Sequence, residues 1–191
     1  MSPQHAAYLK LLARWNATVN LTSLQVDPPD ARAVERLIEE PLRAAQFVRP
    51  DDRLAIDIGS GGGSPALPLK IACPWLRYVL VESRERKCAF LREAVRELGL
   101  RDVEVFAGRF EDLPSRLGLE SGADLISCRA VRLNDQLWDA ASSLVAPSGR
   151  LLWFGGDPLG FPSTFHLRSE VESLLVLTPS AAFGEARDVS R

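Results

Sequence analysis

The chain has 191 residues, of which 46% are hydrophobic and 25% are charged, and its formal net charge is −2. This length suits one α/β domain with a substantial core and is too short for two ordinary domains, so we expect a single domain over residues 1–191. The small negative charge argues against a protein held on nucleic acid by bulk electrostatics, so a nucleic-acid partner would have to meet a local basic patch.

Cysteine and histidine usage predicts neither a redox site nor a metal site. Cys73, Cys88 and Cys128 form no CxxC pair and lie in apolar stretches, so we interpret them as reduced core cysteines. His5 and His166 belong to no HExxH motif or Cys/His cluster. No run approaches the ~18 apolar residues of a membrane span, and no secretion segment is visible, so we expect a cytoplasmic protein without a membrane partner.

The first 49 residues predict a helical extension. Ser2 and Pro3 are a typical cap and first-turn pair, and Asp30 is the expected N-cap of a second helix. Pro41 lies within that second helical pattern and is expected to kink or end it. The apolar face of the first helix is formed by Tyr8, Leu11, Leu12, Trp15 and Val19.

From residue 54 the pattern alternates between strands and helices. We predict strands at 54–58, 78–81, 103–106, 124–128 and 149–154, and helices at about 65–73, 84–98 and 134–145, with Gly99 ending the second of them. This alternation predicts a mostly parallel, Rossmann-like α/β core over residues 54–191, with helices on both faces. Beyond residue 154 the pattern weakens: 155–162 reads as loop, 173–177 as a strand, and the tail from Ala186 as a candidate edge strand.

The most informative stretch is the glycine-rich turn after the first predicted strand. Asp57 lies inside the strand, and Gly59, Gly61, Gly62 and Gly63 follow it. Glycines permit unusual backbone angles and let a ligand lie against bare main chain. Because the carboxyl ends of parallel strands share one edge of the sheet, we expect a nucleotide-like ligand at this loop.

Polar residues after the neighbouring strands point to the same edge. Glu82 ends the second strand, where its carboxylate can accept both ribose hydroxyls of an adenosine; the alternative is a helix cap ahead of Arg84. Residues 108–111 follow the third strand and Arg129 follows the fourth. Four strand ends therefore converge on one place.

The loop alone leaves the ligand open. Gly61, Gly63 and Ala66 fit a dinucleotide frame, which keeps a dehydrogenase among the alternatives. Asp57 disfavours it, because a dinucleotide fold usually has an apolar residue there, whereas an acid can hold the amino or sulfonium end of S-adenosylmethionine. No His, Lys or Tyr constellation for hydride transfer is visible.

The chain from about Tyr8 to Phe154 resembles the bacterial 16S ribosomal RNA guanine-N7 methyltransferases, also called the glucose-inhibited division protein B family. The pairing of Trp15-Asn16 with Asn20-Leu-Thr22 is the more specific part of the resemblance. The other matching segments are Asp57-Ile-Gly-Ser-Gly-Gly-Gly-Ser-Pro65, Leu80-Val-Glu-Ser83 with Lys87 and Phe90-Leu91, Arg109-Phe-Glu111, and Ser127-Cys-Arg-Ala130.

The resemblance implies a class I S-adenosylmethionine-dependent methyltransferase fold: seven strands with the last antiparallel, preceded by a helical N-terminal extension. It implies S-adenosylmethionine as cofactor, with contacts from Gly59, Ser64, Phe110, Glu111 and Arg129. Phe110 can equally be a core residue. Together with the loop and strand-end arguments, the expected cofactor-binding set is Asp57, Gly59, Gly61, Gly63, Ser64, Glu82, Phe110, Glu111 and Arg129.

The implied chemistry needs no general base, because guanine N7 carries a lone pair and loses no proton on methylation. We therefore name no catalytic residue and expect positioning by the loop and by Arg129, whose guanidinium needs an anionic or π partner. The implied partner is ribosomal RNA or the small ribosomal subunit. RNA contacts are expected from Lys10, Arg14, Arg36, Arg84 and Lys87; the alternative is a solvated helix face neutralised by Glu85, Glu93 and Glu97.

Three segments depart from the family pattern. The family's Arg-His-x-x-Asp-Ser-Leu is Arg36-Leu-Ile-Glu-Glu-Pro-Leu42 here, its Gly-Phe/Leu-Pro-Gly is Gly63-Ser-Pro-Ala66, and its Lys-Gly after the fifth strand is Gly155-Gly156. All three lie on the side expected to face substrate. Two alternatives therefore stay open beside an rRNA methyltransferase: a methyltransferase for a different substrate, and a catalytically inactive cofactor-binding or interaction module.

Overall fold

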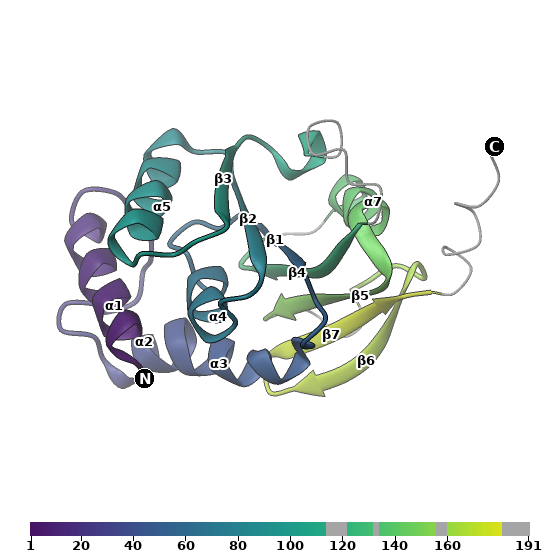
Figure 1. Cartoon of the computed structure of the whole chain (residues 1–191), viewed down its shortest axis with the longest axis horizontal. Helices are drawn as coiled ribbons and strands as arrows, with labels where there is room; N and C mark the ends of the chain where they lie inside the picture. The colour runs from purple at the N-terminus through teal and green to yellow at the C-terminus, as the bar shows by residue number, and fades with distance from the viewer. Residues whose placement is uncertain (114–121, 132–133, 156–159, 181–191) are drawn as a thin grey trace.

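The computed structural model describes residues 1–113, 122–131, 134–155 and 160–180, and it contains one seven-stranded sheet (Figure 1). The strand order is β3-β2-β1-β4-β5-β7-β6. Strands β1 to β5 pair in parallel, and β7 is antiparallel to both of its neighbours. This topology confirms the predicted Rossmann-like sheet. The strands are β1 (Leu54–Ile58), β2 (Arg77–Glu82), β3 (Val103–Ala107), β4 (Ala123–Arg129), β5 (Val145–Phe154), β6 (Phe165–Val171) and β7 (Leu174–Pro179).

Strand β1 is buried on both faces, as its apolar run predicts. Leu54, Ile56 and Ile58 point to the face covered by helix α7 (Asp135–Leu144). Ala55 and Asp57 alternate with them and point to the opposite face, which is covered by helices α4 (Ala66–Ala72) and α5 (Glu85–Glu97). Helices therefore lie on both faces, and the strand order reverses between β1 and β4.

The N-terminal extension packs outside α4 and α5. Helix α1 (Pro3–Asn16) begins with the expected cap, because the Ser2 hydroxyl accepts the backbone N–H of His5. Trp15, near the end of α1, makes an edge-on ring contact with Phe90 of α5, with the ring centroids 5.9 Å apart. This contact fixes the extension against the core and explains one half of the Trp-Asn motif.

The second helical segment does not end at Pro41. It runs through α2 (Ala31–Val34), a π-helical turn η1 (Glu35–Glu39), α3 (Glu40–Ala44) and a 3₁₀ turn η2 (Ala45–Phe47). In the π turn the N–H of Glu40 bonds the carbonyl of Glu35 instead of that of Arg36. The helix thus accommodates the proline by a local change of hydrogen-bond register, and the carbonyl of Arg36 is left without a helical donor because Pro41 has no N–H.

The C-terminal part holds one strand that the sequence pattern did not predict. Strand β7 covers the predicted segment 173–177 except for its first residue, whereas β6 lies in a stretch that shows no apolar alternation. β6 is an edge strand, and most of its side chains are exposed or half-buried, so its residues carry no core pattern. The candidate edge strand from Ala186 falls outside the described residues.

Two further expectations concern helices and cysteines. Among the described residues, no helix has the length and apolar character to span a membrane. Cys73, Cys88 and Cys128 are all buried and unpaired, which agrees with core cysteines.

A buried ion pair joins the chain before β1 to β5. Asp52 accepts a hydrogen bond from the guanidinium of Arg150 and another from the backbone N–H of Arg49, the latter at 2.7 Å. The side chains of the pair are only 4% and 5% exposed. Because both charges are desolvated, removing either one would leave the other buried without a compensating charge.

Replacing Asp52 with alanine strands the Arg150 charge in the interior, so the free energy of unfolding should fall by about 3–5 kcal/mol. Urea unfolding followed by circular dichroism measures this loss. Asp51 is the exposed neighbour, and Asp51→Ala should change stability by no more than about 0.5 kcal/mol. Equal stabilities for the two variants would show that Arg150 does not need its partner.

Candidate functional site

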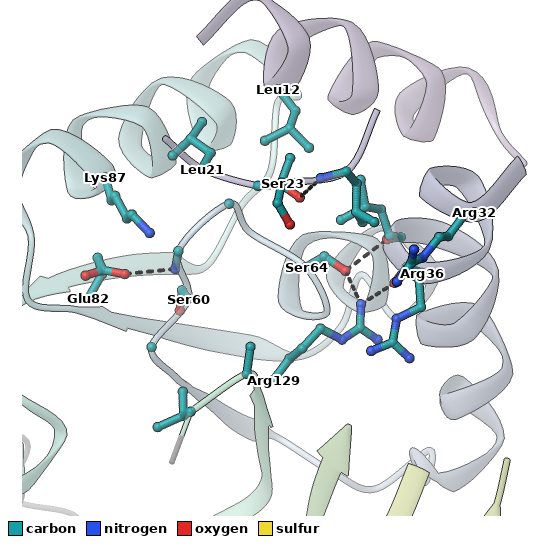
Figure 2. A pocket seen from close by; sticks show the side chains of 18 residues that line it. Leu12, Leu21, Ser23, Arg32, Arg36, Ser60, Ser64, Glu82, Lys87 and Arg129 are labelled. Atoms are coloured by element: carbon teal, nitrogen blue, oxygen red, sulfur yellow. Dashed lines mark hydrogen bonds between the residues drawn. The ribbon is translucent and has the colours of Figure 1, made fainter. Parts of the chain in front are cut away.

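A cavity of about 450 Å³ opens at the carboxyl edge of the sheet, beside the point where the strand order reverses (Figure 2). Its floor is the glycine loop, and its walls come from residues 21–24, the helical segment 31–47, α5 and the chain after β4. The volume lies in the range of small-molecule sites, and the position is where open α/β sheets bind ligands.

The glycine loop presents bare backbone to this cavity. Gly59 and Gly61 have φ angles of 67° and 49°, which favour glycine. A Cβ on Gly61 would point toward Lys87 Nζ and Glu82 Oε2, at 3.9 and 4.0 Å. Gly63, with φ of 86°, serves packing instead, because a Cβ there would lie 2.4 Å from Leu67 Cδ1.

The N-terminal extension holds the loop from above. The hydroxyl of Tyr8 donates to the carbonyl of Gly62 at 2.7 Å. The side chain of Asn16 accepts from the N–H groups of Leu21 and Thr22, at 2.9 and 3.0 Å, and donates to the carbonyl of Thr22 at 3.1 Å. The Trp-Asn and Asn-Leu-Thr motif is therefore a clamp: Asn16 fixes residues 21–22, which form part of the cavity wall.

The carboxylate of Glu82 accepts two backbone hydrogen bonds at the edge of the cavity. Its Oε1 accepts the N–H of Arg84 at 2.9 Å, at the start of α5, and its Oε2 accepts the N–H of Gly61 at 3.0 Å. The side chain still lines the cavity. Each carboxylate oxygen has a second lone pair, so these contacts leave acceptor capacity for a hydroxyl pair.

Arg129 has the partners that a guanidinium at a strand end requires. It lies 4.5 Å over the ring of Phe154, donates to Glu40 at 2.6 Å and to the hydroxyl of Ser64 at 3.0 Å, and bonds the carbonyl of Arg36. The carbonyl of Arg36 is the one that the π turn leaves without a helical donor. Burial lowers the pKa of Arg129 to about 10, which still keeps it charged at neutral pH.

The carboxylate of Glu40 also serves a second arginine. Arg36 donates to it at 2.8 Å and to the hydroxyl of Ser173 at 3.0 Å, and Ser173 itself donates to Glu40. Ser173 lies at the tip of the β6–β7 hairpin. This network joins the helical segment, the end of β4 and the hairpin behind the cavity wall.

Asp57 lies beneath the loop and lines neither the cavity nor the hollow described next. Its Oδ1 accepts the hydroxyl of Ser127 at 2.6 Å, and its Oδ2 has no hydrogen-bond partner among the described residues. Burial raises its pKa to about 6.

A second hollow of about 230 Å³ adjoins the cavity and shares Gly59 with it. It is lined by Phe110 and Glu111 of the 3₁₀ turn η3 (Phe110–Asp112), together with Val81. Phe110 is buried and packs in the core, as one of the two interpretations expects; it also lines this hollow, and its contact with a cofactor stays a prediction. Of the expected cofactor set, the cavity and this hollow bring together all but Asp57 and Gly63.

The cations expected to bind RNA do not form one patch. Arg36 and Lys87 line the cavity, and Arg84 lines a smaller hollow that also touches Lys87. Lys10 and Arg14 line a separate hollow on the outer side of α1.

Much of the charged face of α5 is neutralised by ion pairs. Arg14 pairs with Glu93 and Glu97, at 3.3 and 3.0 Å, and both acids also lie within 4 Å of Arg96. Arg92 lies 3.6 Å from Glu85. This part of the face agrees with the alternative of a solvated, internally paired surface.

The structure adds residues that sequence reasoning missed. The cavity wall includes Leu12, Thr22, Ser23, Arg32 and Leu37, all from the N-terminal extension. Arg32 lies on an ordinary helical turn, and only the folded arrangement places it at a cavity. Within the described ranges, no group of three or more His, Cys, Asp or Glu residues could hold a metal ion.

A statistical model of the GidB family, described as rRNA small subunit methyltransferase G, matches residues 1–159. The chain is 41% identical over 157 residues to ribosomal RNA small subunit methyltransferase G of Stenotrophomonas maltophilia strain K279a, which covers 82% of this chain and 66% of the relative. It is 31% identical over 159 residues to the protein of that name from Helicobacter pylori, covering 83% and 84%. The chain thus spans just under two thirds of the first relative's length.

Solved structures share the fold at low sequence identity. A point mutant of MtNAS in complex with S-adenosylmethionine superposes with a TM-score of 0.64 at 16% identity, over 92% of this chain and 74% of that chain. TrmN from Thermus thermophilus gives 0.58 at 21% identity, over 74% and 48%.

Asp57 should make stability depend on pH. Its usual pKa of 3.8 applies to the unfolded chain, whereas the folded protein releases the proton at about 6. Between these values the folded state binds the proton more tightly, so stability should fall as pH rises through this window, by about 3 kcal/mol in total at about 1.4 kcal/mol per pH unit.

Asp57→Asn removes this ionisation. Urea unfolding at a series of pH values measures the free energy of unfolding. Between pH 4 and 6 this free energy should rise for the variant relative to the wild-type protein, and at higher pH the difference should stay constant. Parallel stability curves for the two proteins would show that Asp57 does not titrate in this window.

Proposed function

We propose, because this chain belongs to the GidB family, that it is an S-adenosylmethionine-dependent methyltransferase that methylates N7 of a guanine in 16S ribosomal RNA. The observation that carries the proposal is the bare glycine loop beside Glu82, at the floor of a cavity that adjoins the Phe110–Glu111 hollow. The family membership supports the reaction, and the geometry supports a nucleoside ligand at this edge.

The residues present fit an adenosyl ligand. A side chain at Gly61 would occupy the cavity floor between Lys87 and Glu82, so the glycine there leaves backbone open to a ligand. Glu82 keeps acceptor capacity for ribose hydroxyls, and Phe110 with Glu111 lines the hollow where an adenine ring would lie. When bound, S-adenosylmethionine supplies an electrophilic methyl group.

The chain's own contribution to such a reaction is alignment. Guanine N7 offers a lone pair and gives up no proton, so no residue has to act as a base, and a fixed geometry between the two reactants provides most of the acceleration. Arg129 is a positioning residue in this scheme. Its hydrogen bonds go to Ser64, Glu40 and the Arg36 carbonyl, so it fixes the cavity wall.

A second candidate is a methyltransferase for a different nucleophile. The observation that favours it is Leu37, which stands where the family pattern has histidine and lines the cavity. Replacing an imidazole by an aliphatic side chain removes a hydrogen-bonding group from the wall that faces the substrate. The family's lysine after the fifth strand corresponds to Gly155, and Gly156 lies outside the described residues.

The proposed function is tested in two steps with the full chain. Calorimetry with S-adenosylhomocysteine reports cofactor binding, and labelled S-adenosylmethionine offered with small ribosomal subunits or bare rRNA reports transfer, followed by mapping of the product. We expect binding and incorporation at one guanine. Binding without incorporation would reject the rRNA substrate in favour of the second candidate, and no binding would overturn the proposal.

Glu82→Gln should weaken S-adenosylhomocysteine binding by about 10- to 100-fold, because hydrogen bonds to a charged acceptor are among the stronger ones. The side chain keeps its size and loses its charge. Glu104→Gln is the matched control, since Glu104 on β3 makes an exposed ion pair with Arg77 on β2. Calorimetry should find wild-type affinity for the control.

A ligand without the ribose 2′-hydroxyl separates two explanations for such a loss. The wild-type protein should bind the 2′-deoxy ligand more weakly than the parent, and Glu82→Gln should bind both with similar affinity. If removal of the 2′-hydroxyl instead lowers the affinity of the variant by the same factor as that of the wild type, Glu82 acts only by holding Gly61, and the ribose contact is rejected.

A further inference from the structure

Positively charged side chains outnumber negatively charged ones in the lining of the cavity. Among the described residues, the lining contains four cations and one carboxylate; these are Arg32, Arg36, Lys87 and Arg129, with Glu82. Glu40 lies behind the wall and forms ion pairs with both Arg36 and Arg129. Two of the four cations therefore have an acidic partner already.

Lys87 and Glu82 lie together on one side of the glycine loop (Figure 2). Both are about 4 Å from the point where a Cβ of Gly61 would stand, at 3.9 and 4.0 Å. They place one positive and one negative charge on this side of the cavity. Arg32 lies across the cavity, on the helical segment that forms the other wall, and within the described ranges its guanidinium has no ion pair or hydrogen bond.

Folding alone gives no reason for a cation at this place. Arg32 is exposed and sits in the first turn of the helical segment that begins at Ala31, with Asp30 as its N-cap. The N-terminal end of a helix carries a partial positive charge, which disfavours a cation in the first turn. An anionic ligand in the cavity would reverse that unfavourable interaction.

The wall that carries Arg32 belongs to the extension rather than to the sheet edge. The groups suited to an adenosyl ligand, namely the glycine loop, Glu82 and the Phe110 hollow, all lie at the carboxyl ends of β1, β2 and β3. Arg32 lies on the helical segment, across the cavity from Glu82 (Figure 2). The anion held by Arg32 is therefore expected to arrive with the substrate.

We propose that Arg32 binds a backbone phosphate next to the nucleotide that is methylated, and so selects an RNA segment whose target base is unpaired. A guanidinium suits this task because its planar donors match phosphate oxygens in pairs. A base that enters the cavity must leave its helix, and its phosphates then remain at the mouth. This inference rests on the proposed function and adds the residue that orients the substrate strand.

The test uses the full chain and a short single-stranded RNA that contains one guanosine. Binding is measured at several salt concentrations for the wild-type protein, Arg32→Ala, Arg32→Lys and Arg101→Ala. Arg101 is the matched control: it is exposed and precedes β3, at the opposite edge of the sheet from the cavity. The same proteins are titrated with S-adenosylhomocysteine, which reports folding and cofactor binding independently of RNA.

Arg32→Ala should weaken RNA binding by about tenfold, the effect of one hydrogen-bonded charge. Its slope of log affinity against log salt should become shallower by about 0.7, the value for one phosphate contact on a single strand. The RNA affinity of Arg32→Lys should lie between those of the wild-type protein and Arg32→Ala, because lysine keeps the charge but not the paired donors. Arg101→Ala should match the wild-type protein, and S-adenosylhomocysteine affinity should be equal in all four.

A chemically altered RNA identifies the phosphate itself. Replacing the linkage beside the guanosine with an uncharged methylphosphonate should weaken wild-type binding by about tenfold and leave Arg32→Ala unaffected. Unchanged RNA binding by Arg32→Ala would overturn the inference. So would a loss of S-adenosylhomocysteine affinity, which would assign Arg32 to the cofactor carboxylate. A wild-type protein that binds S-adenosylhomocysteine but no RNA would reject the phosphate contact and leave a methyltransferase in place.

Discussion

A single buried guanidinium connects the parts of the chain that meet at the cavity. Arg129 ends β4, and its donors reach the hydroxyl of Ser64 after the glycine loop, the carboxylate of Glu40 and the carbonyl of Arg36. The carbonyl is available because the π turn and Pro41 leave it without a helical donor. The extension is thus attached to the sheet by a polar contact that its own irregular helix makes necessary.

This attachment has an energetic cost that the surrounding core offsets. A guanidinium with a 12% exposed side chain has lost most of its hydration, and its neighbour Asp57 is buried with one oxygen unpaired. Both lie beside the central strands of the sheet, which pack against apolar clusters on both faces. Polar residues at the carboxyl edge therefore depend on stability supplied by β1, β2, β4 and β5, as is common at functional sites.

Local patterns were enough to predict the parallel sheet and the glycine loop, because a buried strand followed by glycines is visible in a few consecutive residues. They were also enough for the capping roles of Ser2 and Asp30. Edge strand β6 could not be predicted in this way, since its side chains are mostly outside the core. The expectation that Pro41 ends or kinks its helix also depends on a local rule, whereas the actual solution, a π turn, relies on Arg129 from a distant strand.

The site shows the same division between local and distant information. The roles of Gly59, Gly61 and Glu82 follow from their places at strand ends. The hydrogen bond from Tyr8 to the carbonyl of Gly62 joins residues far apart in the chain, and no periodicity encodes it. Arg32 is an ordinary exposed residue of a helix until the fold puts its turn at the cavity wall. Conversely, Arg14 has the charge expected of an RNA contact, and only its neighbours on α5 reveal that it is already paired.

The hairpin between β6 and β7 contacts the helical segment as well as completing the edge of the sheet. Its tip residue Ser173 bonds Glu40 and Arg36, and Glu172 beside it pairs with Arg43 at 2.7 Å. Drift at this tip during evolution would tilt the helical wall and so reshape the entrance through which a substrate passes. Relatives that differ in their C-terminal hairpins could therefore diverge in what they accept while every residue on the floor of the pocket stays the same.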